Sequence, residues 1–151
     1  MMKILFICHG NICRSPAAEM TAVHLAGERG LSGAVAFSSA AAHTDEIGND
    51  IYPPMKRVLL SHGVPCPRRA ARLMTKRDYE LYDHLIGMDE ENLRDLLRMY
   101  DGDPKGKISL MMDWAGLPGQ AVSDPWYTRD FEKAYADILE GCEGLLARLF
   151  P

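Results

Sequence analysis

The chain has 151 residues, of which 47% are apolar and 25% are charged, and its formal net charge is −4. This composition fits a single globular domain, residues 1–151, with enough apolar surface to build a core. A mildly acidic chain gives no electrostatic reason to expect nucleic acid or an anionic membrane as a partner. No apolar stretch approaches the roughly 18 residues of a membrane-spanning helix, and the run near Met1 is too short for a signal peptide. We therefore expect a cytoplasmic protein.

Short apolar runs alternate with helical patterns along the chain. In chain order, the sequence predicts a strand at 3–7, a helix at 16–29, a strand at 34–39, a helix at 55–62, a strand at 84–88, a helix capped by Asp89, a strand at 107–112 and a helix at 131–149. Glycines are expected to end the first two helices, at Gly30 and Gly63. This alternation favours an α/β domain with a parallel sheet.

The segment from Cys8 to Pro16 lies between the first expected strand and the first expected helix, where open α/β sheets bind their ligands. Ser15 is expected to cap the helix and Pro16 to take its first position. Gly10 permits close backbone approach and an unusual φ. Unpaired N–H groups and the positive end of the helix dipole favour an anion. Such a loop can surround a tetrahedral oxyanion, with Arg14 binding two of its oxygens.

The positive potential from the helix N-terminus and Arg14 also makes Cys8 a candidate nucleophile. Thiols at helix N-termini beside cations titrate below the ordinary value of ~8.5, and a thiolate is competent for covalent catalysis. Asn11 can brace the loop, and the Ser15 hydroxyl can donate a hydrogen bond to the sulfur as it leaves. The alternative is a Cys that is simply a small buried hydrophobe.

A zinc site is the second alternative, because Cys8, His9 and Cys13 are all possible ligands. No second close pair of ligands follows, since Cys66 and Cys142 are isolated in the sequence. Four widely spaced cysteines also do not make a disulfide scaffold. A close cysteine pair in a reducing compartment therefore indicates catalysis more than structural zinc.

A nucleophile that attacks phosphate needs a general acid for the leaving oxygen. Asp124 is the candidate, because Pro125 stiffens its segment and biases it towards an extended conformation. Trp126 and Tyr127 offer a flat wall for an aromatic leaving group. The alternative is an ordinary surface turn before the last helix.

These motifs resemble those of the low-molecular-weight protein tyrosine phosphatases. The resemblance rests on Cys8-His9-Gly10-Asn11-Ile12-Cys13-Arg14-Ser15-Pro16 and Asp124-Pro125-Trp126-Tyr127. Further stretches match in family order: Ser38-Ser39-Ala40-Ala41, His62-Gly63-Val64-Pro65, and Met88-Asp89-Glu90-Glu91-Asn92-Leu93-Arg94-Asp95-Leu96.

The resemblance implies a four-stranded parallel sheet flanked by helices, with a phosphotyrosine-containing protein as substrate. Cys8 would form a phosphocysteine, Arg14 would bind the phosphate, and Asp124 would be the general acid and then the base. Asn11 and Ser39 correspond to residues that brace the loop, and Cys13 corresponds to a cysteine that can form a reversible disulfide with Cys8. No metal or organic cofactor is implied, and we expect a monomer. The substrate-binding residues would be His9, Gly10, Asn11, Ile12, Cys13, Ser15, Trp126 and Tyr127.

Two related activities and one other class of function remain as alternatives. Arsenate reductases of this fold need further cysteines to relay a disulfide, and Cys66 and Cys142 are too isolated for that. Protein-arginine phosphatases tend to carry Thr where this chain has Ile12, so Ile12 favours phosphotyrosine. A redox-sensing, phosphate-binding module without turnover is the remaining alternative.

The chain departs from the family pattern at two places. Asp45 falls where the family usually has an aromatic wall of the cleft, although a shift of one or two residues would place Ile47 or Tyr52 there instead. Arg68 or Arg69 stands where the family has a His, and we interpret this change as surface variation.

Overall fold

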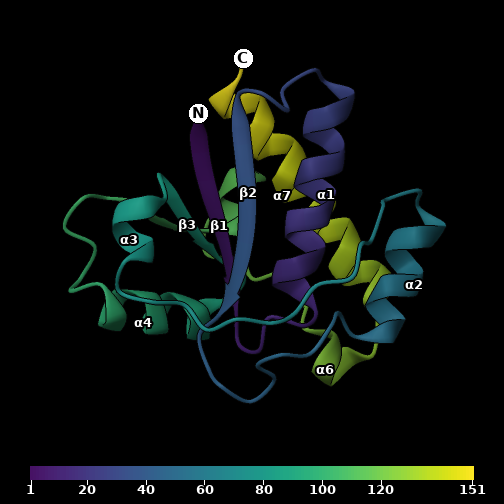
Figure 1. The fold of residues 1–151 in the computed structure, drawn as a ribbon, viewed down its shortest axis with the longest axis horizontal. Coiled ribbons are helices and arrows are strands. Elements are labelled where there is room, and N and C mark those ends of the chain that lie inside the picture. The colour runs from purple at the N-terminus through teal and green to yellow at the C-terminus, as the bar shows by residue number, and fades with distance from the viewer.

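The computed structural model describes residues 1–151 and contains one sheet of four parallel strands. The strands are β1 (Met2–Cys8), β2 (Val35–Ala41), β3 (His84–Gly87) and β4 (Ile108–Leu110). Their order in the sheet is β2-β1-β3-β4. Strand β1 is therefore an inner strand that pairs with β2 on one side and β3 on the other (Figure 1). This confirms the predicted α/β fold with a four-stranded parallel sheet.

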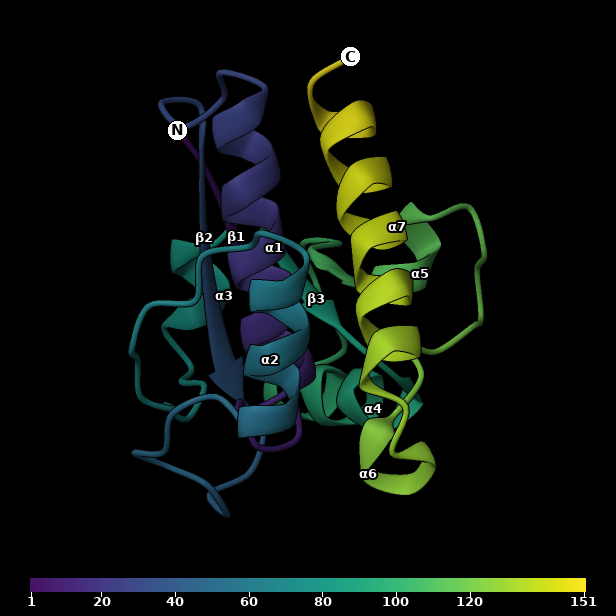
Figure 2. The ribbon, with the colours of Figure 1, turned by 90° about the vertical axis from the view of Figure 1, so that its right-hand side faces the viewer.

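Helices cover both faces of the sheet. The largest, α1 and α7, run side by side, with α2 and α5 against α7 (Figure 2). On the other face, α3 and α4 pack a smaller core. The helices are α1 (Arg14–Glu28), α2 (Pro53–Ser61), α3 (Asp78–Leu81), α4 (Glu90–Met99), α5 (Met111–Trp114), α6 (Pro125–Thr128) and α7 (Phe131–Leu149).

Strand β1 is apolar at every central position because both of its faces are buried. Ile4 and Phe6 belong to the core beneath α1 and α7, whereas Leu5 and Ile7 belong to the core beneath α3 and α4. Successive side chains of a strand point to opposite faces, so a continuous apolar run is what a central parallel strand requires. The strand therefore delivers Cys8 to the carboxyl edge of the sheet in a fixed position.

Most predicted boundaries differ from the observed ones by one or two residues. Helix α1 begins at Arg14 with Cys13 at its N-cap, so the predictions of Ser15 as the cap and of Pro16 as the first helical residue are wrong. The last predicted strand is too long, because Met111 and Met112 already belong to α5. The short helices α3 and α6 were not predicted, since four residues are too few to show a helical period.

The remaining predicted elements are present. Helix α7 spans the predicted residues 131–149, and Asp89 caps α4 through a hydrogen bond from the backbone N–H of Asn92. Gly30 and Gly63, at φ 69° and 76°, follow α1 and α2. Helices of sufficient length and apolarity to cross a membrane are absent.

Candidate active site

Cys8 lies at the end of β1 and is held by two donors from the first turn of α1. It is 4% exposed. The backbone N–H of Ser15 donates to Cys8 Sγ at 3.4 Å, and Ser15 Oγ lies 3.0 Å from the same sulfur. Donors of this kind stabilise negative charge on sulfur. The geometry suits a sulfur nucleophile.

The Ser15 hydroxyl is oriented by a second partner. Asn11 Nδ2 donates to Ser15 Oγ at 2.8 Å, so this oxygen accepts on that side. Its own hydrogen is then free to point at Cys8 Sγ. This is the arrangement expected of a hydroxyl that helps the sulfur to leave. Asn11 and Ser15 are both fully buried, so their side chains support the loop from beneath and do not face the pocket.

The unusual backbone conformation of the loop falls on Asn11, which has a φ of 60°. The prediction placed it at Gly10, which is not in the left-handed region, so that prediction is wrong. Asn tolerates this region better than most residues. Gly10 serves another purpose: a Cβ there would lie 3.1 Å from Glu46 Cγ, which leaves little room for any larger residue.

Two arginines that follow α2 in the sequence hold the Asn11 side chain. Arg69 Nη2 donates to Asn11 Oδ1 at 2.5 Å, and the backbone N–H of Arg72 donates to the same oxygen at 3.2 Å. The interpretation of this position as surface variation is therefore wrong for Arg69. Arg68 is exposed and makes no hydrogen bond or ion pair. A hydrogen-bonded path leads from Arg69 through Asn11 and Ser15 to the sulfur of Cys8.

The Arg14 guanidinium is fixed by three acceptors and is only 6% exposed. Nη1 donates to the carbonyl of Val122 at 3.1 Å, and Nη2 donates to Asp89 Oδ2 at 2.8 Å and Asp124 Oδ2 at 3.3 Å. Burial lowers the pKa of Arg14, but Cys8 and the two carboxylates raise it by more, so the net shift is upward. Arg14 therefore keeps its charge in a place where that charge can face an anion.

Sequence reasoning missed the role of Asp89 as a partner of Arg14. Asp89 Oδ1 accepts from the backbone N–H of Asn92, while Oδ2 faces Arg14. One carboxylate thus caps α4 and positions the guanidinium. The position of Asp89 just after a predicted strand could have indicated this role, because the carboxyl ends of neighbouring parallel strands meet at one edge of the sheet.

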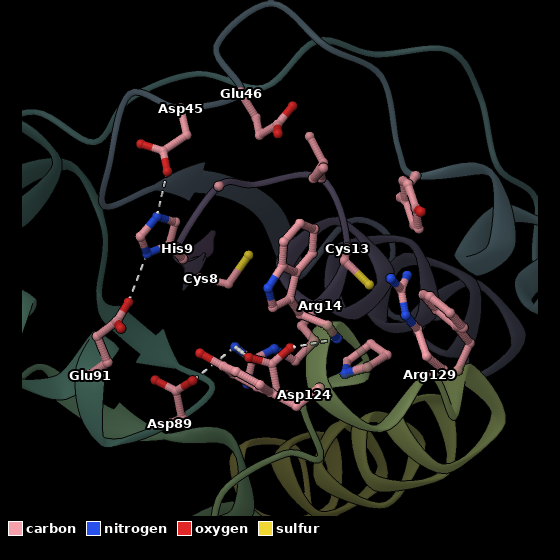
Figure 3. Close-up of a pocket in the computed structure, with 17 residues that line it drawn as sticks. Cys8, His9, Cys13, Arg14, Asp45, Glu46, Asp89, Glu91, Asp124 and Arg129 are labelled. Atoms are coloured by element: carbon pink, nitrogen blue, oxygen red, sulfur yellow. Dashed lines mark hydrogen bonds and ion pairs between the residues drawn. The ribbon is translucent and has the colours of Figure 1, made fainter.

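Asp124 approaches from the segment before α6. Its Oδ1 accepts from the backbone N–H of Trp126 at 3.0 Å, so it caps that short helix. Its Oδ2 faces Arg14, which lies in the phosphate loop 110 residues away in the sequence. Figure 3 shows Asp124, Arg14 and Cys8 around one pocket.

Cys13 lines the same pocket but differs from Cys8 in its surroundings. Burial, and to a lesser extent the neighbouring Cys8, raise the pKa of the Cys13 thiol to about 12. The Cys13 thiol therefore stays neutral, which leaves Cys8 as the better candidate for the nucleophile.

The predicted residues Cys8, His9, Gly10, Ile12, Cys13, Arg14, Asp124, Trp126 and Tyr127 all line the pocket. Trp126 and Tyr127 are 70% and 82% exposed, so their rings stand at its mouth. Asp45 and Tyr52 both line the pocket, whereas Ile47 does not. Of the three residues considered for the position of the missing aromatic wall, a carboxylate and a tyrosine therefore reach the pocket.

Ser39 does not reach the phosphate loop. Its Oγ donates to Glu19 Oε1 on α1 at 2.6 Å. The implied direct bracing of the loop by Ser39 is therefore not what this chain has, because Arg69 and Arg72 provide the hydrogen bonds to Asn11.

His9 is held between two carboxylates at the rim of the pocket (Figure 3). Its Nε2 lies 2.9 Å from Asp45 Oδ2, and its Nδ1 lies 2.8 Å from Glu91 Oε1. Partial burial lowers the pKa of His9, but the hydrogen bonds to Glu91 and Asp45 outweigh burial and raise it. Neither carboxylate was predicted as a partner, because they are 36 and 82 residues away in sequence.

The family model for low molecular weight phosphotyrosine protein phosphatase matches residues 3–150. The chain belongs to this family. It is 35% identical to the low molecular weight protein-tyrosine-phosphatase YfkJ of Bacillus subtilis, covering 99% of this chain and 96% of YfkJ. It is 36% identical to the Homo sapiens phosphatase of the same family name, covering 97% of this chain and 94% of that one.

Solved structures agree with this placement. The crystal structure of YfkJ superposes with a TM-score of 0.94, covering 99% of this chain and 94% of that chain. The structure of a Drosophila arginine phosphatase superposes with a TM-score of 0.89 at 29% identity, covering 99% of both chains. The solved structures similar to this chain thus include one that is named for arginine and not for tyrosine.

Proposed function

We propose that this phosphatase hydrolyses phosphotyrosine in proteins, with Cys8 as nucleophile, Arg14 as phosphate ligand and Asp124 as general acid and base. The supporting observation is that these three side chains line one pocket although they come from β1, the start of α1 and the segment before α6. Family membership supports a phosphoprotein as the substrate. A cytoplasmic monomer is part of the same proposal.

In the first step, Cys8 Sγ attacks phosphorus and the bond from phosphorus to the tyrosine oxygen breaks. Asp124, as a carboxylic acid, donates its proton to that oxygen, so tyrosine leaves neutral. Arg14 and the loop amides stabilise the charge on the transferring phosphoryl group. The hydrogen bonds that hold Arg14 keep its guanidinium oriented before substrate arrives, so little ordering is needed during the reaction.

In the second step, a water molecule attacks phosphorus and the sulfur–phosphorus bond breaks. Asp124, now a carboxylate, accepts a proton from the water, and Cys8 leaves as a thiolate. The Ser15 hydroxyl, 3.0 Å from Sγ, donates to the sulfur as negative charge returns to it. Inorganic phosphate is the second product, and both protein groups return to their starting forms.

The walls of the pocket support an aromatic leaving group. Tyr52, Trp126 and Tyr127 line it, and Ile12 adds an apolar contact near the phosphate. Aromatic contacts add roughly 0.5–1.5 kcal/mol beyond the burial of their area. Acidic groups on the rim, Asp45 among them, favour substrates with Lys or Arg beside the phosphotyrosine.

Phosphoarginine is the second candidate substrate. The acidic rim that would attract basic residues could also face a guanidinium group, and one structural relative is an arginine phosphatase. Ile12 favours phosphotyrosine because its side chain cannot donate a hydrogen bond, whereas a Thr at that place could.

The deciding assay compares p-nitrophenyl phosphate, phosphotyrosine, phosphoserine and phosphoarginine with EDTA present. We expect phosphotyrosine to be hydrolysed with the highest kcat/KM and Cys8→Ser protein to be inactive with all four. Faster hydrolysis of phosphoarginine would select the second candidate. Retention of more than a small part of the activity in Cys8→Ser protein would exclude Cys8 as the nucleophile.

A further inference from the structure

Two histidines and the carboxylates of Asp45, Glu91 and Asp95 gather beside the catalytic pocket, and His9, Asp45 and Glu91 line it. His9 belongs to the phosphate loop, His43 to the segment after β2, and Glu91 to the first turn of α4. The two imidazole rings are stacked, with centroids 4.2 Å apart and planes at 19°. One ring nitrogen of each histidine and a carboxylate oxygen of Glu91 all lie within 4.8 Å of one another.

We propose that His9, His43 and Glu91 form a binding site for one divalent transition-metal ion of the zinc class. Two imidazoles and a carboxylate are ligands that such ions prefer, and water can complete a tetrahedral shell. Zn²⁺ binds these ligands at ~2.0–2.2 Å, so its ligand atoms lie roughly 3.3 Å apart. The three ligand atoms must therefore approach one another by up to about 1.5 Å. Because a metal lies in the plane of each imidazole that binds it, the two stacked rings must also rotate towards the ion. His9, His43 and Glu91 are 44%, 41% and 52% exposed, which leaves them free to do so.

The outer hydrogen bonds of the two histidines match those of known metal ligands. Asp45 Oδ2 faces His9 Nε2 at 2.9 Å, which leaves His9 Nδ1 on the side of Glu91. Asp95 Oδ2 faces His43 Nε2 at 2.9 Å, so His43 Nδ1 is the nitrogen left for a metal. A carboxylate that accepts the second N–H of a metal-binding histidine orients the ring and raises its basicity. Asp95 is only 11% exposed, so its position is well defined.

This set of ligands differs from the zinc site considered from the sequence. That site would have used Cys8, His9 and Cys13, so both thiolates would have been metal ligands. The proposed site uses no sulfur and leaves Cys8 free. It would also join three segments that are far apart in the chain, because His9 is 82 residues from Glu91. An ion bound only to the folded state would raise its stability.

The test measures Zn²⁺ binding by calorimetry to Cys8→Ser protein, which removes the nucleophilic thiolate as a competing ligand. We expect one equivalent of Zn²⁺ to bind and to raise the melting temperature. Adding His43→Gln should weaken binding by at least about 10-fold, since loss of an outer-shell partner alone costs about 10- to 100-fold. Glu91→Gln, at a more exposed position, should weaken it in the same direction.

His62→Gln is the matched control. His62 is 42% exposed, lies 2.8 Å from Glu132 and stacks on Tyr135, but it has no second histidine beside it. Zn²⁺ affinity should be unchanged in this variant. A Co²⁺ spectrum of the Cys8→Ser protein should show no thiolate-to-cobalt charge-transfer band, because the proposed ligands contain no sulfur.

Three results would overturn the proposal. They are the absence of stoichiometric Zn²⁺ binding, equal affinity in the His43→Gln and His62→Gln proteins, and a thiolate band that assigns the metal to Cys13 or Cys66. Melting temperatures measured without metal show whether each variant is folded. None of these results depends on the substrate of the phosphatase.

Discussion

Replacement of Arg69 by Met tests whether the path of hydrogen bonds behind the nucleophile supports catalysis. Arg69 Nη2 donates to Asn11 Oδ1 at 2.5 Å, and Asn11 Nδ2 in turn donates to Ser15 Oγ at 2.8 Å. Ser15 Oγ is the group that faces Cys8 Sγ. Arg69 Nη1 also donates to the carbonyl oxygen of Asn49 at 3.3 Å. Met fills a similar volume without a donor, so the substitution removes both hydrogen bonds and the charge while the aliphatic packing is largely kept.

The expected fall in kcat depends on which hydrogen bonds Asn11 keeps in the Arg69→Met protein. Hydrogen bonds that involve a charged group contribute about 1.5–3 kcal/mol. The backbone N–H of Arg72 still donates to Asn11 Oδ1 at 3.2 Å, so this oxygen is not left without a partner. We therefore take the lower value, about 1.5 kcal/mol, which corresponds to a fall in kcat of about 10-fold if the loop must be ordered in the transition state. The free energy of unfolding should fall by a similar amount.

Arg68→Met is the matched control, because Arg68 is the adjacent arginine, is exposed and makes no hydrogen bond or ion pair. Steady-state kinetics with p-nitrophenyl phosphate and urea unfolding should leave the Arg68→Met protein unchanged. Arg69→His, which restores the residue type that the family carries, should recover part of the activity. If the Arg68→Met and Arg69→Met proteins have equal kcat and stability, the inferred role of Arg69 is wrong.

Three further substitutions test the remaining parts of the site. Asp124→Asn should slow the hydrolysis of substrates with poor leaving groups by ~10²–10⁴ and that of p-nitrophenyl phosphate less; an equal loss across leaving groups of different pKa would count against Asp124 as the acid. Mild peroxide should inactivate the enzyme reversibly through a Cys8–Cys13 disulfide, and Cys13→Ser should recover more slowly with thiol. Peptide mapping that finds Cys8 paired elsewhere, or unpaired, would exclude this protection. Asp45→Trp should lower KM for p-nitrophenyl phosphate and reduce the preference for basic-flanked phosphotyrosine peptides, as measured by kcat/KM against acidic-flanked ones; unchanged values would show that Asp45 does not contribute to substrate preference.

Local sequence patterns are enough to predict the fold class, the order of the four strands and the four longer helices along the chain, and the location of the phosphate loop. These features depend on local patterns: the apolar run of β1 is long enough to be a buried strand, and the period of α7 is long enough to define its limits. Residues 8–16 also lie next to one another in the chain, so the grouping of Cys8 and Arg14 needed no knowledge of long-range contacts.

The distant side chains that complete the site are known only from the three-dimensional structure. Asp89 reaches Arg14 across 75 residues, Arg69 reaches Asn11 across 58, and Asp45 and Glu91 meet on His9. Single exposed or half-buried polar residues in loops carry no periodic signal, so their partners cannot be read from spacing. The parallel sheet brings them together because the carboxyl ends of β1, β2 and β3 meet at one edge, and the loops that leave that edge must share the space around Cys8.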